Sequence, residues 1–313
     1  MSAMEPPAAP AYLARVGDAA GDRATVLSIW QGVLGEEKRR HAAKYDWFYL
    51  GCPWGEPLLE LLQHTQTATC VATAAAGSRR MLWRGRAIRA GVLADMAVST
   101  RHRTLGPALT LQSGLMAAAS GRFDLLYGFP NPKATAVAQR AGYPVIGQLR
   151  RYTCVLRHGG YFARLMPRIL AQVLGWMFDA FRDGQRAVHA SAHPRMTATW
   201  HDAADSRMDE LWQSSPHGNG LIAVRDAAML RWRFDQLPEI RTRYLYLSES
   251  GTDSLQAWFA CQTDGTSLHV RDFWSRDAAQ GIRRTLVDAL GRAVRRTGER
   301  YTSLSVEYAA PAS

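Results

Sequence analysis

Two halves of this chain carry the same features in the same order, which points to a duplicated fold. Each half has a tryptophan six residues before a proline, an aspartate just ahead of a loop, and the start of an apolar run. The matched positions are Trp47 with Trp232, Asp95 with Asp272, and Leu125 with Thr302, the last two pairs both 177 residues apart. We therefore expect the 313 residues to form two diverged copies of one domain.

Apolar periodicity predicts helices that alternate with short strands in both halves. In the first half the predicted helices cover residues 23–34, 36–49, 107–119 and 132–141, and the predicted strands cover 68–74, 80–83, 87–89, 92–98, 125–129 and 145–156. In the second half helices are predicted over 205–213, 225–234 and 281–296, with strands at 243–248, 255–261, 268–274 and 303–308. This order indicates an α/β or α+β class, with a mixed sheet flanked by helices in each domain.

We divide the chain into a disordered lead (1–11), an N-terminal domain (12–157), a linker (158–195) and a C-terminal domain (196–313). The linker contains an amphipathic apolar run over residues 165–181, which charged residues interrupt, so it is not predicted to span a membrane. We favour a connector packed between the domains. The alternative is contact with an anionic membrane surface, aided by Arg157, Arg164, Arg168 and Arg182.

The net charge of +11 comes almost entirely from arginine, because only three of the 38 basic residues are lysines. Arginine suits bidentate contact with phosphate, so phosphorylated ligands, nucleic acid and anionic membranes all stay open, as does a compositional origin of the arginines. The four cysteines form no C-x-x-C pair, and the N-terminus does not resemble a signal peptide. We expect a cytoplasmic protein with reduced thiols and no metal site, one that can also sit peripherally at the inner membrane face.

The most informative segment is residues 94–109, which is predicted to form a strand, a tight turn and the start of a helix. Such a junction directs unpaired backbone N–H groups and the positive end of the helix toward one point, where an anion can bind. Gly106 would let a ligand approach the backbone closely, and Arg101 and Arg103 add positive charge. The segment is a candidate phosphate-binding loop.

At these residues the sequence resembles the GNAT superfamily of N-acetyltransferases. The acyl-coenzyme A loop of that family reads Arg or Gln, two residues, Gly, one residue, then Gly or Ala, and residues 103–108 read Arg-Thr-Leu-Gly-Pro-Ala. Residues 126–134 and 140–143 resemble the fifth strand, asparagine, helix and Gly-aromatic pair of the family. The resemblance covers residues 12–157 well. It implies two tandem GNAT-like domains with mixed, mostly antiparallel sheets, the second a degenerate copy.

The resemblance implies an acyl-coenzyme A, acetyl-CoA or another, bound along the predicted strand and the loop after it. Backbone groups of the strand would pair with the pantetheine arm, and loop amides would hold the pyrophosphate. An asparagine and a lysine further on would help to hold the ligand, although the lysine is equally interpreted as a solvated side chain. The implied cofactor-binding residues are Met96, Ala97, Val98, Arg103, Thr104, Leu105, Gly106, Pro107, Ala108, Asn131 and Lys133. Pro107 departs from a full set of donors because it has no N–H.

The catalytic groups are less well defined by the resemblance. Asp95 is the candidate base, and its alternative role is to anchor the loop through Arg101 or Arg103. The backbone amide of Val98 would polarise the thioester carbonyl. Many members of the family have a tyrosine acid where this chain has Ala138, which leaves Tyr127 as the candidate acid and Tyr143 as an alternative.

Three aromatic residues, Trp47, Tyr49 and Trp54, are candidates for stacking on an acceptor, and a packed aromatic cluster is the alternative. The resemblance thus implies an acyl-CoA-dependent N-acyltransferase acting on an amine, such as an amino sugar in polysaccharide biosynthesis. Two alternatives remain, an aminoacyl-tRNA-dependent transferase and a non-catalytic CoA-binding or scaffold protein. No nucleic-acid partner is expected. The second domain is predicted to bind no cofactor, since it has no glycine at the position that matches Gly106.

Overall fold

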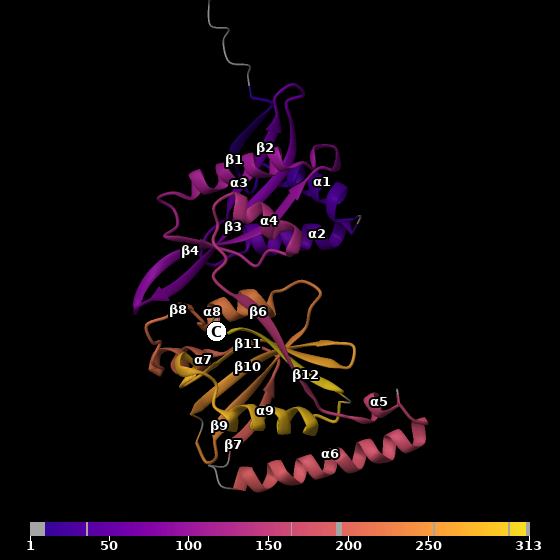
Figure 1. The fold of residues 1–313 in the computed structure, drawn as a ribbon. Helices are drawn as coiled ribbons and strands as arrows, with labels where there is room; N and C mark the ends of the chain where they lie inside the picture. The colour runs from indigo at the N-terminus through magenta and orange to yellow at the C-terminus, as the bar shows by residue number, and fades with distance from the viewer. Residues whose placement is uncertain are drawn as a thin grey trace, which may run out of the picture. The chain divides into compact units, whose positions relative to one another are not determined.

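The structure is a computed structural model that describes residues 10–35, 37–163, 165–191, 196–252, 254–299 and 301–310. All but the last two residues of the predicted disordered lead fall outside this range. The chain forms two compact units, each with its own sheet (Figure 1). The first unit runs to Val145 and also takes in Leu221–Val224, and the second comprises Ile146–Gly220 and Arg225–Ser313.

The sheet of the first unit has the order β1-β2-β3-β4-β5, in which only the β4–β5 pair is parallel. A short strand from later in the chain, β8, adds to the end of β3. The strands are β1 (Tyr12–Gly17), β2 (Leu58–His64), β3 (Thr69–Trp83), β4 (Arg86–Val98), β5 (Leu125–Tyr127) and β8 (Leu221–Ala223). This arrangement agrees with the predicted mixed, mostly antiparallel sheet.

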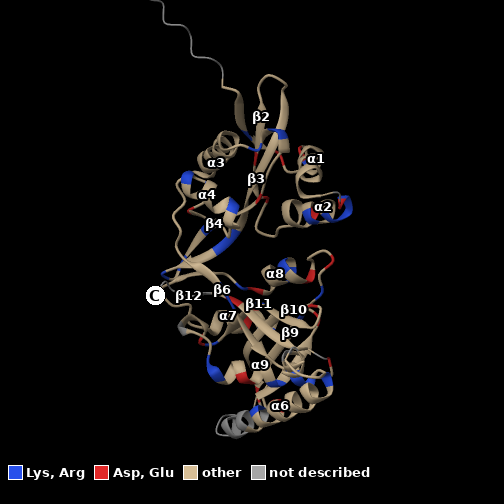
Figure 2. Cartoon of the chain, turned by 45° about the vertical axis from the view of Figure 1, so that its right-hand side comes forward, with Lys and Arg blue, Asp and Glu red and all other residues tan. Residues whose placement is uncertain are grey.

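Helices cover both faces of this sheet, with α1 and α2 on one side and α3 and α4 on the other (Figure 2). In β2, Leu58 and Leu62 pack in the core under α3, while Leu59 and Leu61 are fully buried outside that cluster. The helical elements are α1 (Arg23–Leu34), α2 (Lys38–Tyr45), the π-helical turn η1 (Asp46–Leu50), the 3₁₀ turn η2 (Thr100–His102), α3 (Leu105–Ala119) and α4 (Pro132–Arg140).

The second unit contains a six-stranded sheet of order β6-β12-β11-β10-β9-β7, again with one parallel pair, β11–β12. Its strands are β6 (Gln148–Val155), β7 (Met196–His201), β9 (Thr242–Glu249), β10 (Leu255–Asp264), β11 (Ser267–Ser275) and β12 (Ser303–Ala310). Its helical elements are α5 (Gly159–Phe162), α6 (Arg168–Ser191), α7 (Ser206–Ser214), α8 (Ala227–Leu230), η3 (Arg231–Asp235), η4 (Ala278–Gln280) and α9 (Arg284–Arg296).

The two units repeat the same plan in detail, as the sequence predicted. In each, a helix continues into a π-helical turn whose second residue is the matched tryptophan, Trp47 in η1 and Trp232 in η3. In each, a β-bulge lies at the matched aspartate, where the pairing register shifts by one residue beside Asp95 in β4 and beside Asp272 in β11. The parallel strand then follows a helix in both units, β5 after α3 and β12 after α9.

The structure corrects the predicted boundary of the first domain. Residues 145–156 were predicted to close the first sheet, but β6 pairs with β12 along its whole length in the second sheet. The residues between 146 and 157 therefore belong to the second unit, and so do the helices of the predicted linker. A strand gains its stability from whichever edge it pairs with, and local sequence does not identify that edge.

Strand lengths were also predicted wrongly, and packing explains why. β2 was missed because both of its faces are buried, which removes the polar-apolar alternation. β3 and β4 were each split at small residues that look like strand breakers. A Cβ on Gly77 would lie 2.5 Å from Phe48, and one on Gly91 would lie 2.7 Å from Leu126, so close packing requires the small residues.

The core under α3 contains a carboxyl group. Glu60 of β2 is 2% exposed, its Oε2 has no hydrogen-bond partner, and a Cβ on Gly114 of α3 would lie 2.6 Å from its Oε1. Burial raises the pKa of Glu60 from 4.5 to about 7, and the charge of Arg15 only partly offsets this. Since the folded pKa is the higher one, Glu60 lowers stability as the pH rises from about 4.5 to 7.

We expect Glu60→Gln to raise the free energy of unfolding by about 1–3 kcal/mol at pH 8 and to change it little at pH 4.5, where Glu60 is protonated in the folded state and about half protonated in the unfolded state. Urea unfolding of both proteins at the two pH values measures this difference. An equal gain at both pH values would show that the charge of Glu60 is not the cause.

Candidate functional site

The candidate site begins where β4 and β5 separate. The two strands pair only through residues 90–92 with residues 125–127, after which β5 ends and β4 continues to Val98. Among the described residues, no strand pairs with residues 93–98 on the side that β5 has left. Backbone N–H and C=O groups of this stretch are therefore available to an extended ligand that adds like a strand.

The separation coincides with the bulge in β4. Thr73 of β3 faces Ala97 and Ala75 faces Ala94, so β4 has one residue more than β3 between these pairs. Asp95 takes up the distortion with a φ of 55°, in the left-handed region that aspartate tolerates better than most residues. A bulge bends its strand, so this residue helps to direct β4 away from β5.

Asp95 is held by groups of α2 and η1 rather than by the loop arginines that the sequence suggested. Its side chain is 8% exposed and forms an ion pair with Lys44, and it accepts a hydrogen bond from the Tyr49 hydroxyl at 3.4 Å. Burial, with the charge of Asp95 beside it, holds the pKa of Tyr49 well above its usual value, so Tyr49 stays protonated and can donate. The Lys44 ammonium also lies 5.1 Å from the ring centre of Trp30.

The loop after β4 is short and contacts the first three strands. His102 contacts the Tyr12 hydroxyl through Nδ1 at 3.0 Å, and its ring lies 5.1 Å from that of His64. The backbone N–H of Ser99 donates to Val71, and Arg103 Nε donates to the carbonyl of Val98 at 3.4 Å. These contacts fix the point at which the next helix begins.

Helix α3 begins at Leu105, two residues earlier than predicted, which makes Pro107 its third residue rather than its first. No side chain caps this end, although Thr104 stands at the capping position. The N–H groups of Leu105 and Gly106 belong to the first turn, where helices leave donors unsatisfied. Pro107 is buried and breaks no helical bond there, but it supplies no donor.

Neither the backbone conformation nor the packing at position 106 requires a glycine. Its φ is not in the left-handed region, and a Cβ built on it would meet nothing within 4 Å. The glycine thus leaves space above an uncapped helix N-terminus, where exposed Thr104, Leu105 and Gly106 lie. Residues 103–108 can therefore accommodate a pyrophosphate in the first turn of α3.

A hollow of about 340 Å³ lies on the α1 side of the same loop. It is lined by α1, by the start of β3 and by the loop itself. The lining residues are Ser28, Ile29, Gly32, Thr69, Cys70, Val71, Ser99, Thr100, Arg101 and His102. Of the two arginines predicted beside the phosphate, Arg101 faces this hollow and Arg103 folds back on Val98.

The segment after β5 contains the remaining predicted ligand-binding and acid residues. Asn131 is the N-cap of α4 and accepts from the N–H of Ala134 at 2.9 Å, and Lys133 is exposed in the first turn. Tyr127 is half-buried and meets Phe129 edge to face. The Tyr143 hydroxyl is buried with no hydrogen-bond partner, and burial raises the pKa of Tyr143 to about 12.

The three aromatic residues proposed for the acceptor have different environments. Tyr49 is fully buried and stacks on Tyr45 with ring centres 4.3 Å apart, so it packs in the core. Trp47 and Trp54 are partly exposed, and Arg80 lies over the Trp54 ring at 5.6 Å. The sequence reading missed Lys44 and His102. Lys44 could have been noticed as one of only three lysines in the chain.

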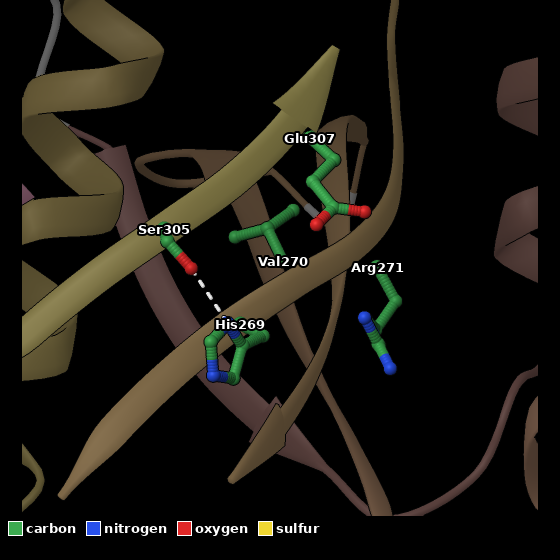
Figure 3. Close-up of a pocket in the computed structure, with 5 residues that line it drawn as sticks. All are labelled: His269, Val270, Arg271, Ser305 and Glu307. Atoms are coloured by element: carbon green, nitrogen blue, oxygen red, sulfur yellow. Dashed lines mark hydrogen bonds between the residues drawn. The ribbon is translucent and has the colours of Figure 1, made fainter. Parts of the chain in front are cut away.

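The corresponding region of the second unit is differently filled. Between β11 and β12 lies a small cavity of about 40 Å³, lined by His269, Val270, Arg271, Ser305 and Glu307. Figure 3 shows His269 hydrogen-bonded to Ser305, with Arg271 and Glu307 to one side. Glu307 also pairs with Arg151 at 2.6 Å. At the start of α9, Arg283 pairs with Asp277 at 2.6 Å.

Two features are absent from the part of the chain that the structure describes. No group of three or more His, Cys, Asp or Glu side chains is arranged to hold a metal ion. None of the described helices combines the length and the apolar character needed to cross a membrane.

We expect Asp95 and Lys44 to be strongly coupled, because removing either charge leaves the other without its partner. Asp95→Asn and Lys44→Met should each lower the free energy of unfolding by about 1–3 kcal/mol, and the double variant should lose less than the sum. Urea unfolding of the four proteins measures the coupling. The exposed pair Arg40 and Glu37, 3.0 Å apart, is the matched control and should show almost none. Additive losses of stability at Asp95 and Lys44 would show that the two side chains are not coupled.

The sequence itself matches no family model and no curated protein, but its structure is similar to solved ones. A probable N-acyltransferase of unknown function from Enterococcus faecalis has a TM-score of 0.65 at 8% identity, over 96% of this chain and 66% of that one. A GCN5-related N-acetyltransferase from Kribbella flavida has a TM-score of 0.59 at 12% identity, over 97% of this chain and 66% of that one.

Saccharomyces cerevisiae N-myristoyltransferase, solved with bound myristoyl-CoA, has a TM-score of 0.50 at 12% identity, over 98% of this chain and 74% of that one. The chain therefore spans slightly less than two thirds of the first two proteins and about three quarters of the third. At these identities the likeness is one of fold, and across both of its units this chain has the fold of the GCN5-related N-acetyltransferases.

Proposed function

We propose that the first unit binds an acyl-coenzyme A and transfers its acyl group to an amine. The observation that carries the proposal is the open first turn of α3, with Gly106 leaving space beside uncapped N–H groups. It stands next to the unpaired stretch of β4, residues 93–98. One ligand with a diphosphate and an extended amide-containing arm fits both features, and coenzyme A is such a ligand.

In this proposal each part of the donor has its own contacts. The diphosphate binds at the amides of Leu105 and Gly106, where the helix dipole favours negative charge. Arg103 supplies positive charge beside them, and the exposed Lys133 is a further candidate. The pantetheine arm pairs with backbone groups of Met96, Ala97 and Val98. The amide of Val98, or that of Ala97, donates to the thioester oxygen as negative charge develops there.

The reaction is attack of the acceptor nitrogen on the thioester carbonyl. The new C–N bond forms, the C–S bond breaks, and coenzyme A leaves as a thiolate that takes up a proton. Tyr127 is the candidate acid for that proton. Tyr143 is an alternative, because its raised pKa keeps its hydroxyl protonated and that hydroxyl has no other partner. The acceptor loses one proton, for which Asp95 is the candidate base.

The ion pair with Lys44 argues for a positioning role of Asp95, which would leave the base to water or to the acceptor. The matched Asp272 supports this, since it pairs with Arg225 at 2.9 Å and Arg233 at 2.7 Å in the same structural role beside a bulge. The partly exposed Trp47 and Trp54 are the aromatic side chains available to an acceptor such as an amino sugar.

We expect Gly106→Asp to weaken coenzyme A binding at least 100-fold, because a carboxylate would occupy the space that a diphosphate needs and repel it. Aspartate suits the first turn of a helix, so the fold should survive. Gly147→Asp is the matched control, since Gly147 also has open space around its Cβ and no left-handed φ. Isothermal calorimetry with coenzyme A measures both variants. Unchanged affinity of Gly106→Asp for coenzyme A would show that residues 103–108 do not bind the diphosphate.

Acyl transfer separates the roles of Asp95. The wild-type protein should release coenzyme A thiol from an acyl-CoA series when a panel of amines, amino sugars included, is supplied. If Asp95 is the base, Asp95→Asn and the double variant with Lys44→Met both lose at least 100-fold in rate. If it positions β4, the double variant recovers most of the activity. Coenzyme A binding with no transfer to any amine would instead favour a non-catalytic binding protein.

A further inference from the structure

Helix α6 exposes its apolar side, which a surface helix ordinarily buries against the protein core. Among the described side chains of residues 165–182, nine large apolar ones are 42–84% exposed. They are Leu165, Ile169, Leu170, Val173, Leu174, Trp176, Met177, Phe178 and Phe181. Leu165 lies just before α6 and the other eight lie on it, and we call the nine together the α6 apolar face. Within the second unit this face is not covered, and the connector packed between the domains stays a prediction.

The opposite side of α6 is the one that packs against its own unit, and it is small and polar. Ala171 is fully buried, and a Cβ on Gly175 would lie 2.5 Å from Gly159 of α5. Asp179 accepts from the backbone N–H of His158 at 3.2 Å and contacts its Nδ1 at 2.5 Å. These contacts fix the rotation of the helix and keep the apolar face outward.

The angular width of the α6 apolar face suits a lipid bilayer. At 100° per residue, its helical positions from Trp176 round to Phe178 cover about 200° of the circumference. That is wider than the narrow stripe that one partner helix buries. Aromatic, aliphatic and methionine side chains are mixed along the face. A helix of this kind lies in the plane of a bilayer with its apolar side among the acyl chains.

The positive charge of the segment around α6 favours an anionic binding surface. Residues 157–191 contain five arginines and two aspartates, with no lysine or glutamate. Arg157 and Arg168 are exposed, and Figure 2 shows basic residues along α6 and α9. Asp179, the acidic side chain of α6 that the structure describes, is engaged by His158. Two copies meeting through α6 would bring ten arginines together, whereas anionic lipid would neutralise them.

We propose that α6 is an interfacial anchor that attaches the second unit to an anionic lipid bilayer. The apolar face enters the acyl-chain boundary, and the long side chains of exposed arginines such as Arg157 and Arg168 reach lipid phosphates from the polar side. This anchor requires no helix that crosses the membrane. It is independent of the transferase proposal, because it uses no residue of the first unit.

Sedimentation of the full-length protein with vesicles tests the anchor. We expect binding to vesicles of equal parts phosphatidylcholine and phosphatidylglycerol, at least tenfold weaker binding to phosphatidylcholine alone, and weakening by salt. Trp176→Gln combined with Phe181→Gln should reduce binding to the anionic vesicles at least tenfold, because both side chains are mostly exposed on the face. Arg157→Gln with Arg168→Gln should reduce the preference for anionic lipid.

Trp83→Gln is the matched control, since Trp83 is 51% exposed in the first unit and should leave vesicle binding unchanged. Thermal unfolding of each variant shows that its fold is intact. The proposal is overturned if the wild-type protein ignores anionic vesicles or if the Trp176 and Phe181 variant binds them as well as wild type does. It is also overturned if that variant instead abolishes self-association seen by sedimentation equilibrium, which would identify the face as a dimer interface.

Discussion

An aspartate at a strand bulge, paired with a cation from the helical segment before it, recurs in both units and shapes each sheet. Asp95 pairs with Lys44 and Asp272 with Arg225 and Arg233. Burial alone would raise the pKa of Asp272, but the two arginines hold it below its usual value, so the carboxylate stays charged. A bulge interrupts the ladder and bends the strand. The ion pair holds that distortion in place, and in the first unit the opening between β4 and β5 begins beside it.

Local patterns predicted what depends on local sequence. The ends of α1 were predicted to the residue, and the strand, turn and helix start of residues 94–109 were located to within two residues, because turn signals are local. The destination of β6 and the partner of Asp95 were not predicted. Each depends on which distant segment lies next to it, and a single sequence with a duplicated pattern offers two equivalent sheets for one strand.

The arginines of this chain fall into two groups, those paired with acidic side chains and those exposed to solvent. Many arginines are already used by acidic side chains of the same unit, which explains part of the composition without any ligand. The pairs are Arg15 with Asp22, Arg23 with Asp46, Arg89 with Asp124, Arg207 with Asp205, and Arg243 with Glu299. Exposed arginines remain beside the α3 loop, where the helix start has no capping side chain, and beside α6, where apolar side chains are exposed.

The two copies differ most at the start of the helix that follows the bulged strand. Neither helix start has a capping side chain, but the first unit has Gly106 with open space around it where the second unit has Arg283. In the second unit Asp277 pairs with Arg283 at the position just before α9, and Glu307 takes part in the small cavity between β11 and β12. Both carboxylates are paired with arginines, Asp277 with Arg283 and Glu307 with Arg151, so these arginines already have anionic partners within the unit. The same fold thus has an open helix N-terminus in one copy, while in the other copy an arginine paired with an aspartate stands at the matching position.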